Sequence, residues 1–186
     1  MNMDIHDGQD EVNPAHPFSE TIIAIGSNLG DSVAYVQRAF DQLQKISVAP
    51  IQKSSLWCST PVECPPGSPD FIKAAALIEP LENETPETLL AKLQAMEIQF
   101  GRQPKTVLNE PRPLDLDLIT FKNAIRDSES LTLPHPSWHQ RRFVLEPLNE
   151  IAPTAILPGQ TKSVSQLLAA LDTGESLTLH SPHGRR

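Results

Sequence analysis

Apolar runs and stretches of helical periodicity alternate along the chain from residue 21 onward. Residues 21–25 form a β-rich apolar run that ends at Gly26, which is typical of a buried strand. A turn follows at 28–31, and Asp31 or Ser32 can cap the segment after it. The next apolar side chains recur at helical spacing and predict an amphipathic helix, built on Val33, Val36, Phe40 and Leu43.

The middle of the chain predicts two more strands and a strongly signalled helix. The strands lie at 51–59 and 71–79, and the proline-rich loop 64–69 between them cannot pair in a sheet. The helix begins after Thr85, because threonine is a good N-cap and Pro86 suits the first helical position. Gly101 supplies a left-handed stop. One face of this helix is apolar and carries Leu89, Leu90, Leu93, Met96 and Phe100.

The last third predicts a fourth strand at 114–121, a short strand at 131–133, a helical turn at 137–142 and a final helix at about 164–171. The main elements therefore follow the order strand, helix, strand, strand, helix, strand, which is the split βαβ order of a ferredoxin-like fold. We expect an α+β sandwich in which an antiparallel sheet carries two helices on one face. Because this fold supports many unrelated activities, it says little about function.

Length, charge and cysteine content restrict the class of protein. The 186 residues fit a single domain at 20–180, with flexible tails at 1–19 and 181–186. A net charge of −8 argues against nucleic acid or an anionic membrane as the main partner. No apolar run approaches the ~20 residues that cross a bilayer, and the acidic N-terminus does not resemble a signal peptide. Cys58 and Cys64 are too few for a disulfide framework and favour thiols in a reducing cytosol. We expect a cytoplasmic chain that is a monomer or a weak dimer.

The sharpest chemical signal is a pair of acids on the fourth predicted strand. Strand side chains alternate between faces, so Asp115 and Asp117 share one face while the leucines between them point to the other. Aspartate is a poor strand former, and two neighbouring carboxylates repel each other unless a cation lies between them. Oxygen ligands of this kind suit Mg²⁺ bound together with substrate phosphates. The alternative is an ordinary solvated sheet face.

Glu97 falls on the apolar face of the second predicted helix, where a carboxylate must find a partner or shift its pKa. Gln94 lies one turn earlier at the edge of the same face. Together they can present an amide and a carboxylate to a polar ligand. The alternative is a boundary glutamate that pairs with Arg102 or with a backbone donor.

Basic side chains cluster in sequence around the acidic strand, namely Arg102, Lys105, Arg112 and Arg141. The planar arginine fork suits phosphate oxygens, and a loop at 102–112 can close over a nucleotide. His135 lies between two prolines that fix its backbone, and its imidazole can donate to a phosphate oxygen. Surface charge for the arginines, and a locally satisfied histidine, are the alternatives. The combination predicts an enzyme that transfers a phosphate-type group from a magnesium-bound nucleotide to a small molecule.

Taken together, these segments resemble the 6-hydroxymethyl-7,8-dihydropterin pyrophosphokinase family of folate synthesis, from about residue 21 to about 171. The most specific part is Pro-Arg-Pro-Leu-Asp-Leu-Asp-Leu at 111–118, followed by Leu-Pro-His-Pro at 133–136. The further matches are Ala-Ile-Gly-Ser-Asn-Leu-Gly at 24–30, Ser-Ser-Leu-Trp at 54–57, Gly-Arg at 101–102, Arg141, Phe143 and Pro-Leu-Asn-Glu-Ile-Ala-Pro at 147–153.

The resemblance implies transfer of pyrophosphate from ATP to the hydroxymethyl group of the dihydropterin, with release of AMP. It implies two Mg²⁺ ions held by Asp115 and Asp117, with these acids, Arg102 and Arg112 as the catalytic set. The implied nucleotide-binding positions are Gln94, Glu97, Arg112, Leu118, Thr132, His135 and Arg141. The implied pterin-binding positions are Ser59, Thr60, Pro61, Val62, Phe71, Lys73 and Phe143, with the pterin stacked between the two phenylalanines.

The chain departs from the family pattern mainly in the acceptor pocket. Lys73 stands where the family usually has an asparagine, whose amide reads the pterin edge with both a donor and an acceptor. Lysine offers donors only. Pro104 and Asn109 stand in the 102–112 loop where some members have Arg and Trp, and Pro136 stands where some have Tyr.

Two alternatives remain open beside this enzyme. A related enzyme would use a modified pterin or another flat heterocycle as acceptor, because Lys73 favours an acceptor-rich or anionic edge. A non-catalytic binding module on the same fold would be indifferent to replacement of Asp115 or Asp117.

Overall fold

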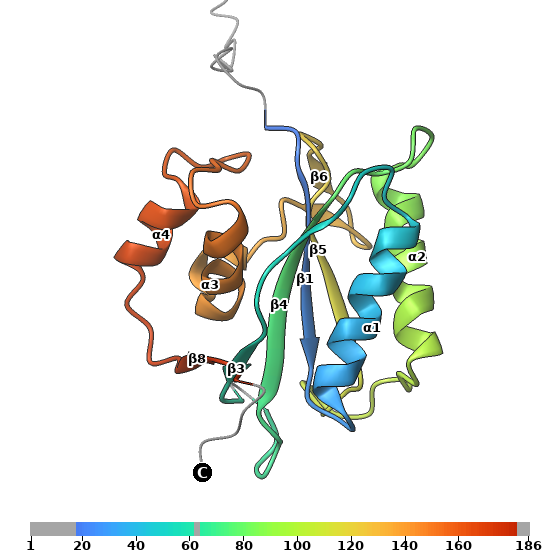
Figure 1. Ribbon diagram of the computed structural model, residues 1–186, viewed down its shortest axis with the longest axis vertical. Coiled ribbons are helices and arrows are strands. Elements are labelled where there is room, and N and C mark those ends of the chain that lie inside the picture. Colours follow the sequence, from blue (N-terminus) through green and yellow to red (C-terminus); the bar gives the residue numbers. More distant parts are fainter. Residues whose placement is uncertain (1–17, 62–63, 182–186) are drawn as a thin grey trace, which may run out of the picture.

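The structure, a computed structural model, describes residues 18–61 and 64–181 and is built on an antiparallel sheet (Figure 1). The strands of this sheet lie in the order β5-β1-β4-β3-β8, and β2 also pairs with β4. Their bounds are β1 (Thr21–Ser27), β2 (Gln52–Lys53), β3 (Trp57–Ser59), β4 (Phe71–Ile78), β5 (Asp115–Thr120) and β8 (Leu177–Leu179). A separate two-stranded sheet joins β6 (Arg126–Asp127) to β7 (Thr132–Leu133).

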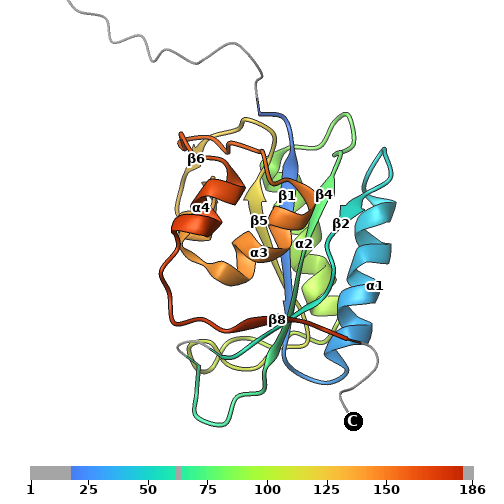
Figure 2. The ribbon, with the colours of Figure 1, turned by 60° about the vertical axis from the view of Figure 1, so that its left-hand side comes forward.

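Helices cover both faces of the sheet (Figures 1 and 2). Helices α1 (Ser32–Lys45) and α2 (Pro86–Gln99) pack on one face, as the sequence predicted. Helices α3 (Arg142–Ile151) and α4 (Val164–Ala170) pack on the other, and a 3₁₀ turn η1 (Trp138–Gln140) leads into α3. The predicted α+β class with an antiparallel sheet is confirmed, and α3 and α4 add a second helical layer to it.

Most element boundaries agree with the sequence pattern, and the differences have local causes. The Thr85 side chain accepts from the Thr88 backbone N–H at 3.1 Å, and Gly101 has the left-handed φ of +96° that ends α2. The predicted strand at 51–59 is two short strands, because Ser54 interrupts the ladder and its Oγ accepts from the Ala75 N–H at 2.9 Å. The helix α3 was not predicted, since Pro147 lies inside it and proline normally disrupts a helix interior.

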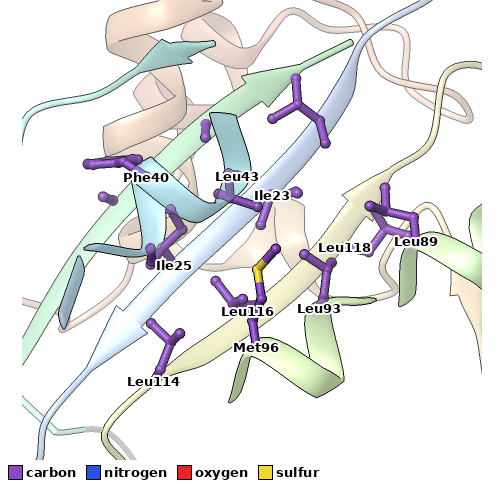
Figure 3. Close-up of a cluster of buried hydrophobic side chains, with 14 of the residues drawn as sticks. Ile23, Ile25, Phe40, Leu43, Leu89, Leu93, Met96, Leu114, Leu116 and Leu118 are labelled. Carbon is purple, nitrogen blue, oxygen red and sulfur yellow. The ribbon is translucent and has the colours of Figure 1, made fainter. Parts of the chain in front are cut away.

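Strand alternation divides the apolar side chains between two cores. Leu114, Leu116 and Leu118 of the β5 segment point towards α1 and α2, where they pack with Leu93 and Met96 of α2 (Figure 3). On the opposite face, α3 covers the sheet with a second apolar cluster. The main members of that second cluster are Ile22 of β1, Leu77 of β4, Ile119 of β5, and Leu145 and Leu148 of α3.

The face of the sheet that α3 covers changes from apolar to polar along the strands. Ile22 and Ile119 lie beneath α3, whereas further along the same faces β1 carries Gly26 and β5 carries Asp115 and Asp117. The apolar cover of α3 does not extend over this end of the sheet. A polar concave region is therefore framed by the strands, by the start of α3 and by the loop before β5.

The structure also bears on the expectations for membrane spans, cysteines and the tails. No helix within the described residues is long and apolar enough to cross a membrane. Cys58 and Cys64 are not joined in a disulfide. Most residues of the predicted tails, 1–17 and 182–186, lie outside the described residues.

Truncating a side chain in the first core should destabilise the protein far more than the same change on the exposed side of one helix. Leu93 is fully buried and Ile98 is 69% exposed, and both lie on α2. We expect Leu93→Ala to lower the free energy of unfolding by about 2–5 kcal/mol and Ile98→Ala to change it by less than about 0.5 kcal/mol. Urea denaturation followed by circular dichroism measures both values, and equal losses would contradict the assigned packing.

Candidate active site

The register of three strands places an acid, a glycine and a lysine in one row across the sheet. Gly26 of β1 pairs with Asp115 of β5 on one side and with Lys73 of β4 on the other. Ala24 pairs in the same way with Asp117 and Ala75. Because glycine has no side chain, the middle of the first row is open above the backbone. The lysine therefore has room to extend over β1 towards the aspartates.

Asp115 has two arginine partners at ion-pair distance, whereas Lys73, Arg141 and Arg112 act on Asp117 only through longer-range electrostatics. Arg102 Nη1 donates to Asp115 Oδ1 at 2.9 Å, and Arg112 Nη2 lies 3.4 Å from Asp115 Oδ2. Burial alone would raise the pKa of Asp115, but Arg112, Lys73 and Arg102 hold this pKa below its usual range. Burial and then the neighbouring Asp115 raise the pKa of Asp117. Within the described residues Asp117 forms no ion pair, so it carries the unfavourable part of the repulsion.

Glu97 accepts a hydrogen bond from a backbone N–H at the unpaired edge of the sheet. β5 is an edge strand, and the outward N–H of Leu116 donates to Glu97 Oε1 at 2.8 Å. The other carboxylate oxygen, Oε2, accepts from Arg102 Nη1 at 2.7 Å. Burial raises the pKa of Glu97 to about 7, against the lowering effects of the Leu116 N–H and of Arg102. Arg102 thus connects α2 to the acidic strand. Glu97 pairs both with Arg102 and with a backbone donor, which are the two partners that the sequence offered as the alternative to ligand binding.

Lys73 is buried between two aromatic rings. Its Nζ lies 4.1 Å from the ring centroid of Phe71 and 4.3 Å from that of Phe143. Phe71 comes from β4 and Phe143 from the first turn of α3, so the two rings face the lysine from different layers of the fold. Burial lowers the pKa of the Lys73 ammonium, while Asp115 and Asp117 oppose this shift.

Backbone hydrogen bonds fix the positions of the arginine and the histidine. Asn28 is almost fully buried; its Oδ1 accepts from the Arg112 N–H at 2.9 Å, and its own N–H donates to the Arg112 carbonyl at 3.1 Å. Its Nδ2 also donates to the Pro69 carbonyl at 3.3 Å, which ties the loop before β4 to the loop before β5. The His135 N–H donates to the Ile119 carbonyl at 2.9 Å, and burial followed by Arg141 lowers the pKa of the imidazole.

Two cavities of about 310 and 300 Å³ meet at the acidic strand. Their common wall consists of Asn109, Arg112, Asp115, Asp117 and Arg141. The first cavity, which we call the ring pocket, is also lined by Ser59, Thr60, Phe71, Lys73 and Phe143. The second, which we call the basic pocket, is also lined by Gln94, Glu97, Arg102, Lys105 and His135. Two molecules that react with each other would fit this arrangement, because each cavity opens onto the same charged wall.

Most of the described positions selected from the sequence line one of these cavities, and three do not. Leu118 belongs to the first hydrophobic core, and Thr132 is exposed on β7. Pro61 is not among the described residues that line the ring pocket. Val62 lies outside the described residues. The side chain of Leu118 is therefore directed away from the site by the same alternation that directs the aspartates into it.

Several residues of the ring pocket were not predicted from the sequence, including Ser137, Gln140 and Glu175. Gln140 is the last residue of η1 and directly precedes Arg141, so its position in the sequence could have indicated that it lies near the site. Glu175 had no local signal, because it is distant in sequence and reaches the site from the segment before β8. Its Oε2 accepts from the Arg142 N–H at 2.7 Å, at the N-terminus of α3, where a negative charge is favourable.

Comparisons with known proteins identify relatives of this chain. A 2-amino-4-hydroxy-6-hydroxymethyldihydropteridine pyrophosphokinase from Synechocystis sp. is 33% identical over 151 residues, which cover 81% of this chain and 75% of that protein. One from Haemophilus influenzae is 38% identical over 137 residues, covering 73% of this chain and 83% of that protein.

A solved structure of Plasmodium falciparum HPPK-DHPS shares the fold. It has a TM-score of 0.63 at 12% identity, covering 82% of this chain and 44% of that longer chain. The 7,8-dihydro-6-hydroxymethylpterin-pyrophosphokinase (HPPK) profile matches residues 22–153, most of the folded part. The chain therefore belongs to the 7,8-dihydro-6-hydroxymethylpterin-pyrophosphokinase family.

Proposed function

We propose that this chain transfers pyrophosphate from ATP to the hydroxymethyl group of 6-hydroxymethyl-7,8-dihydropterin, in the synthesis of folate. The observation that carries the proposal is the charged wall shared by the two cavities, with Asp115 and Asp117 at its centre. The ring pocket accommodates the flat acceptor and the basic pocket the triphosphate. Family membership supports the same reaction.

The acidic pair fits a magnesium site. Asp115 and Asp117 share one face of β5, and the raised pKa of Asp117 shows that a second negative charge there is unfavourable in the protein alone. Carboxylate oxygens combined with phosphate oxygens are the usual ligands of Mg²⁺. We propose that these two residues hold the metal, as two ions, together with ATP. The bound metal would neutralise charge on the phosphate oxygens.

The remaining groups of the basic pocket position the triphosphate and compensate its charge. Arg102, Arg112 and Arg141 bring guanidinium donors to the pocket, and His135 lies beside them. Arg112 Nε is buried and, within the described residues, has no hydrogen-bond partner, so it remains available to a phosphate oxygen. Phosphoryl-type transfer needs mainly positioning and charge stabilisation, which this set provides.

With the acceptor in the ring pocket and ATP in the basic pocket, the proposed reaction would take place at the wall that the two cavities share. The acceptor hydroxyl oxygen forms a bond to the β-phosphorus, and the bond between that phosphorus and the oxygen of the α-phosphate breaks. AMP leaves with that oxygen, and the hydroxyl proton is released. Fixed rings and fixed arginines favour this step because they hold the reacting atoms close and aligned.

We propose that the protein acts in the cytoplasm, as a monomer or a weak dimer.

The direct test of the function is formation of AMP from ATP and Mg²⁺ in the presence of hydroxymethyldihydropterin. We expect AMP to form in proportion to the pterin supplied, with one diphosphorylated pterin per AMP. Quantification of both products by liquid chromatography checks this ratio. AMP at the level of a control without pterin would refute the proposal.

Asp117→Asn should reduce activity and increase stability, a combination that a structural role would not produce. Loss of the charge should lower kcat/KM for AMP formation by about 100-fold or more. Without metal, the same change should raise the melting temperature, because it relieves the repulsion with Asp115. Asp127→Asn, on an exposed position of β6, is the matched control and should leave both quantities unchanged.

Magnesium with ATP should stabilise the wild-type protein more than the Asp117→Asn variant. A ligand that binds only the folded state stabilises by about 2.7 kcal/mol at 100 times its Kd. We expect Mg²⁺ and ATP together to raise the melting temperature of the wild type, with a much smaller rise in the variant. Thermal denaturation with and without EDTA measures the difference. Equal rises in the two proteins would exclude Asp117 as a metal ligand.

A further inference from the structure

Lys73 is a buried lysine whose side chain runs along the sheet towards the two aspartates. It is 8% exposed, and it lies in one row with Gly26 and Asp115 across β4, β1 and β5. A Cβ atom built on Gly26 would lie 2.9 Å from Lys73 Nζ and 3.3 Å from its Cδ, so the stem of the lysine passes over that glycine. The ammonium therefore lies above β1, between its own strand and the strand of the aspartates (Figure 1).

The lysine and both aspartates line one small cavity. This space has a volume of about 10 Å³, and Gly26, Lys73, Asp115, Asp117 and Phe143 are among the residues that line it. A cavity of that size accommodates about one water molecule at most, so the ammonium and the carboxylates are neighbours across a narrow gap. Burial and then Asp115 raise the pKa of Asp117, and Lys73 has the largest opposing effect.

The ammonium supplies positive charge to the aspartate that has no ion pair. Arg102 and Arg112 form ion pairs with Asp115, and among the described residues no such pair reaches Asp117. Two carboxylates on one face of a strand repel each other, and a nearby cation reduces that repulsion. Lys73 therefore provides part of the compensation that a divalent metal ion would provide.

A cation held in this place opposes a metal ion that binds to the same carboxylates. The repulsion between an ammonium and a divalent ion grows as the effective dielectric constant falls, and it is therefore larger in a buried site than in water. The ammonium is also held where it is, because its Nζ lies 4.1 Å from the ring centroid of Phe71 and 4.3 Å from that of Phe143. A free divalent ion therefore meets a repulsion that the protein alone does not offset.

A polyphosphate supplies the missing negative charge. The basic pocket opens onto the same charged wall and offers Arg102, Arg112 and Arg141 to phosphate oxygens. Phosphate oxygens that share the metal with the aspartates offset its positive charge, so Lys73 then faces a combined ligand that is much less positive than the free ion. The electrostatic arrangement therefore favours a metal–polyphosphate complex over the metal alone.

We propose that Lys73 is a built-in counter-cation of Asp115 and Asp117 that opposes the binding of free divalent metal, so that the site takes up metal only together with a polyphosphate. The inference rests on the proposed magnesium site and adds the way in which its occupancy is controlled. Lys73 acts through the charge of its ammonium and does not ligate the metal. The asparagine that the family usually has at this position would exert no such repulsion.

Metal binding in the absence of nucleotide tests the inference directly. Mn²⁺ takes oxygen ligands as Mg²⁺ does, and its sharp electron paramagnetic resonance signal disappears on binding, which yields a Kd. Lys73→Met keeps an unbranched stem and removes the charge, and we expect it to lower the Kd of Mn²⁺ at least about 10-fold. Lys73→Asn should do the same, so the comparison survives if one variant folds poorly. An unchanged or increased Kd in the folded variants would overturn the inference.

A second lysine provides the matched control. Lys53 is exposed on β2, which also pairs with β4, and its Nζ lies 5.5 Å from the ring centroid of Phe40. Lys53→Met removes the same charge from a lysine beside an aromatic ring but far from the aspartates in the register of the sheet. Its Kd for Mn²⁺ should equal that of the wild type. Melting temperatures of all variants establish that they are folded.

A nucleotide analogue tests the role of the polyphosphate. An ATP analogue with a methylene group between the α- and β-phosphorus cannot transfer pyrophosphate, so binding is measured without reaction. Isothermal titration calorimetry at saturating Mn²⁺ gives the Kd of the metal–analogue complex. We expect this Kd to change much less between wild type and Lys73→Met than the Kd of Mn²⁺ alone. An equal gain for the ion and for the complex would contradict the requirement for polyphosphate.

Asp117→Asn separates failure of this inference from failure of the magnesium site. Combined with Lys73→Met, it should abolish the gain in Mn²⁺ affinity, and a gain that persists would overturn the inference. Mn²⁺ binding that depends on Asp117 and not on Lys73 would retain the magnesium site and overturn the inference alone. Binding that is independent of Asp117 in every variant would refute the magnesium site itself.

Discussion

The alternation of side chains along β5 is the constraint on which the rest of this structure depends. Leu116 and its leucine neighbours enter the core beneath α1 and α2, and this burial holds the strand at the edge of the sheet. The same alternation leaves Asp115 and Asp117 no choice of face. A one-residue slip would bury both carboxylates among leucines and expose the leucines, so the register is strongly determined. One strand therefore supplies leucines to the core on one face and the two aspartates of the site on the other.

The second consequence is an excess of negative charge that the protein compensates from several elements. Arg102 at the end of α2 bridges Glu97 and Asp115, and Arg112 approaches Asp115 from the loop that Asn28 anchors. Asp117 receives less compensation. Such an imbalance costs stability in the protein alone and favours the binding of divalent metal and polyphosphate. In the protein alone, this end of the sheet is therefore less stable than a neutral sheet face would be.

The second helical layer converts this strand into a site with two compartments. α3 covers the sheet only as far as Ile119 on β5, and its first turn brings Phe143 opposite Phe71. The polar end of the sheet is thus enclosed without being filled. Within that enclosure, the chain differs from its family pattern at Lys73, which occupies the gap between the rings. The sequence also departs from that pattern on the phosphate side, at Pro104 and Asn109 in the loop before β5.

Much of this could be predicted from the sequence, because the decisive signals are local. The 3.6-residue and 2-residue periodicities determined the main helices and strands, and the spacing of Asp115 and Asp117 determined that both share a face. Glu97 was identifiable as an acid on an apolar stripe. The helix α3 was missed because Pro147 is an unfavourable residue for a helix interior, and its stability comes from packing against the sheet. Leu118 was assigned to the nucleotide site by family resemblance although its own alternation places it in the core.

Only the tertiary structure decided which distant residues meet. The pairing of Gly26 with both Asp115 and Lys73 depends on sheet order, which no local pattern encodes. The meeting of Lys73 with Phe143, and of Glu175 with the start of α3, joins segments that are distant in sequence, and the Arg142–Glu175 pair is separated by 33 residues. The amino-acid sequence by itself determined the chemical groups and the face each would occupy. Their distances, and hence the compensation of charge among them, were decided by long-range packing, because electrostatic effects depend on separation and burial and not on order along the chain.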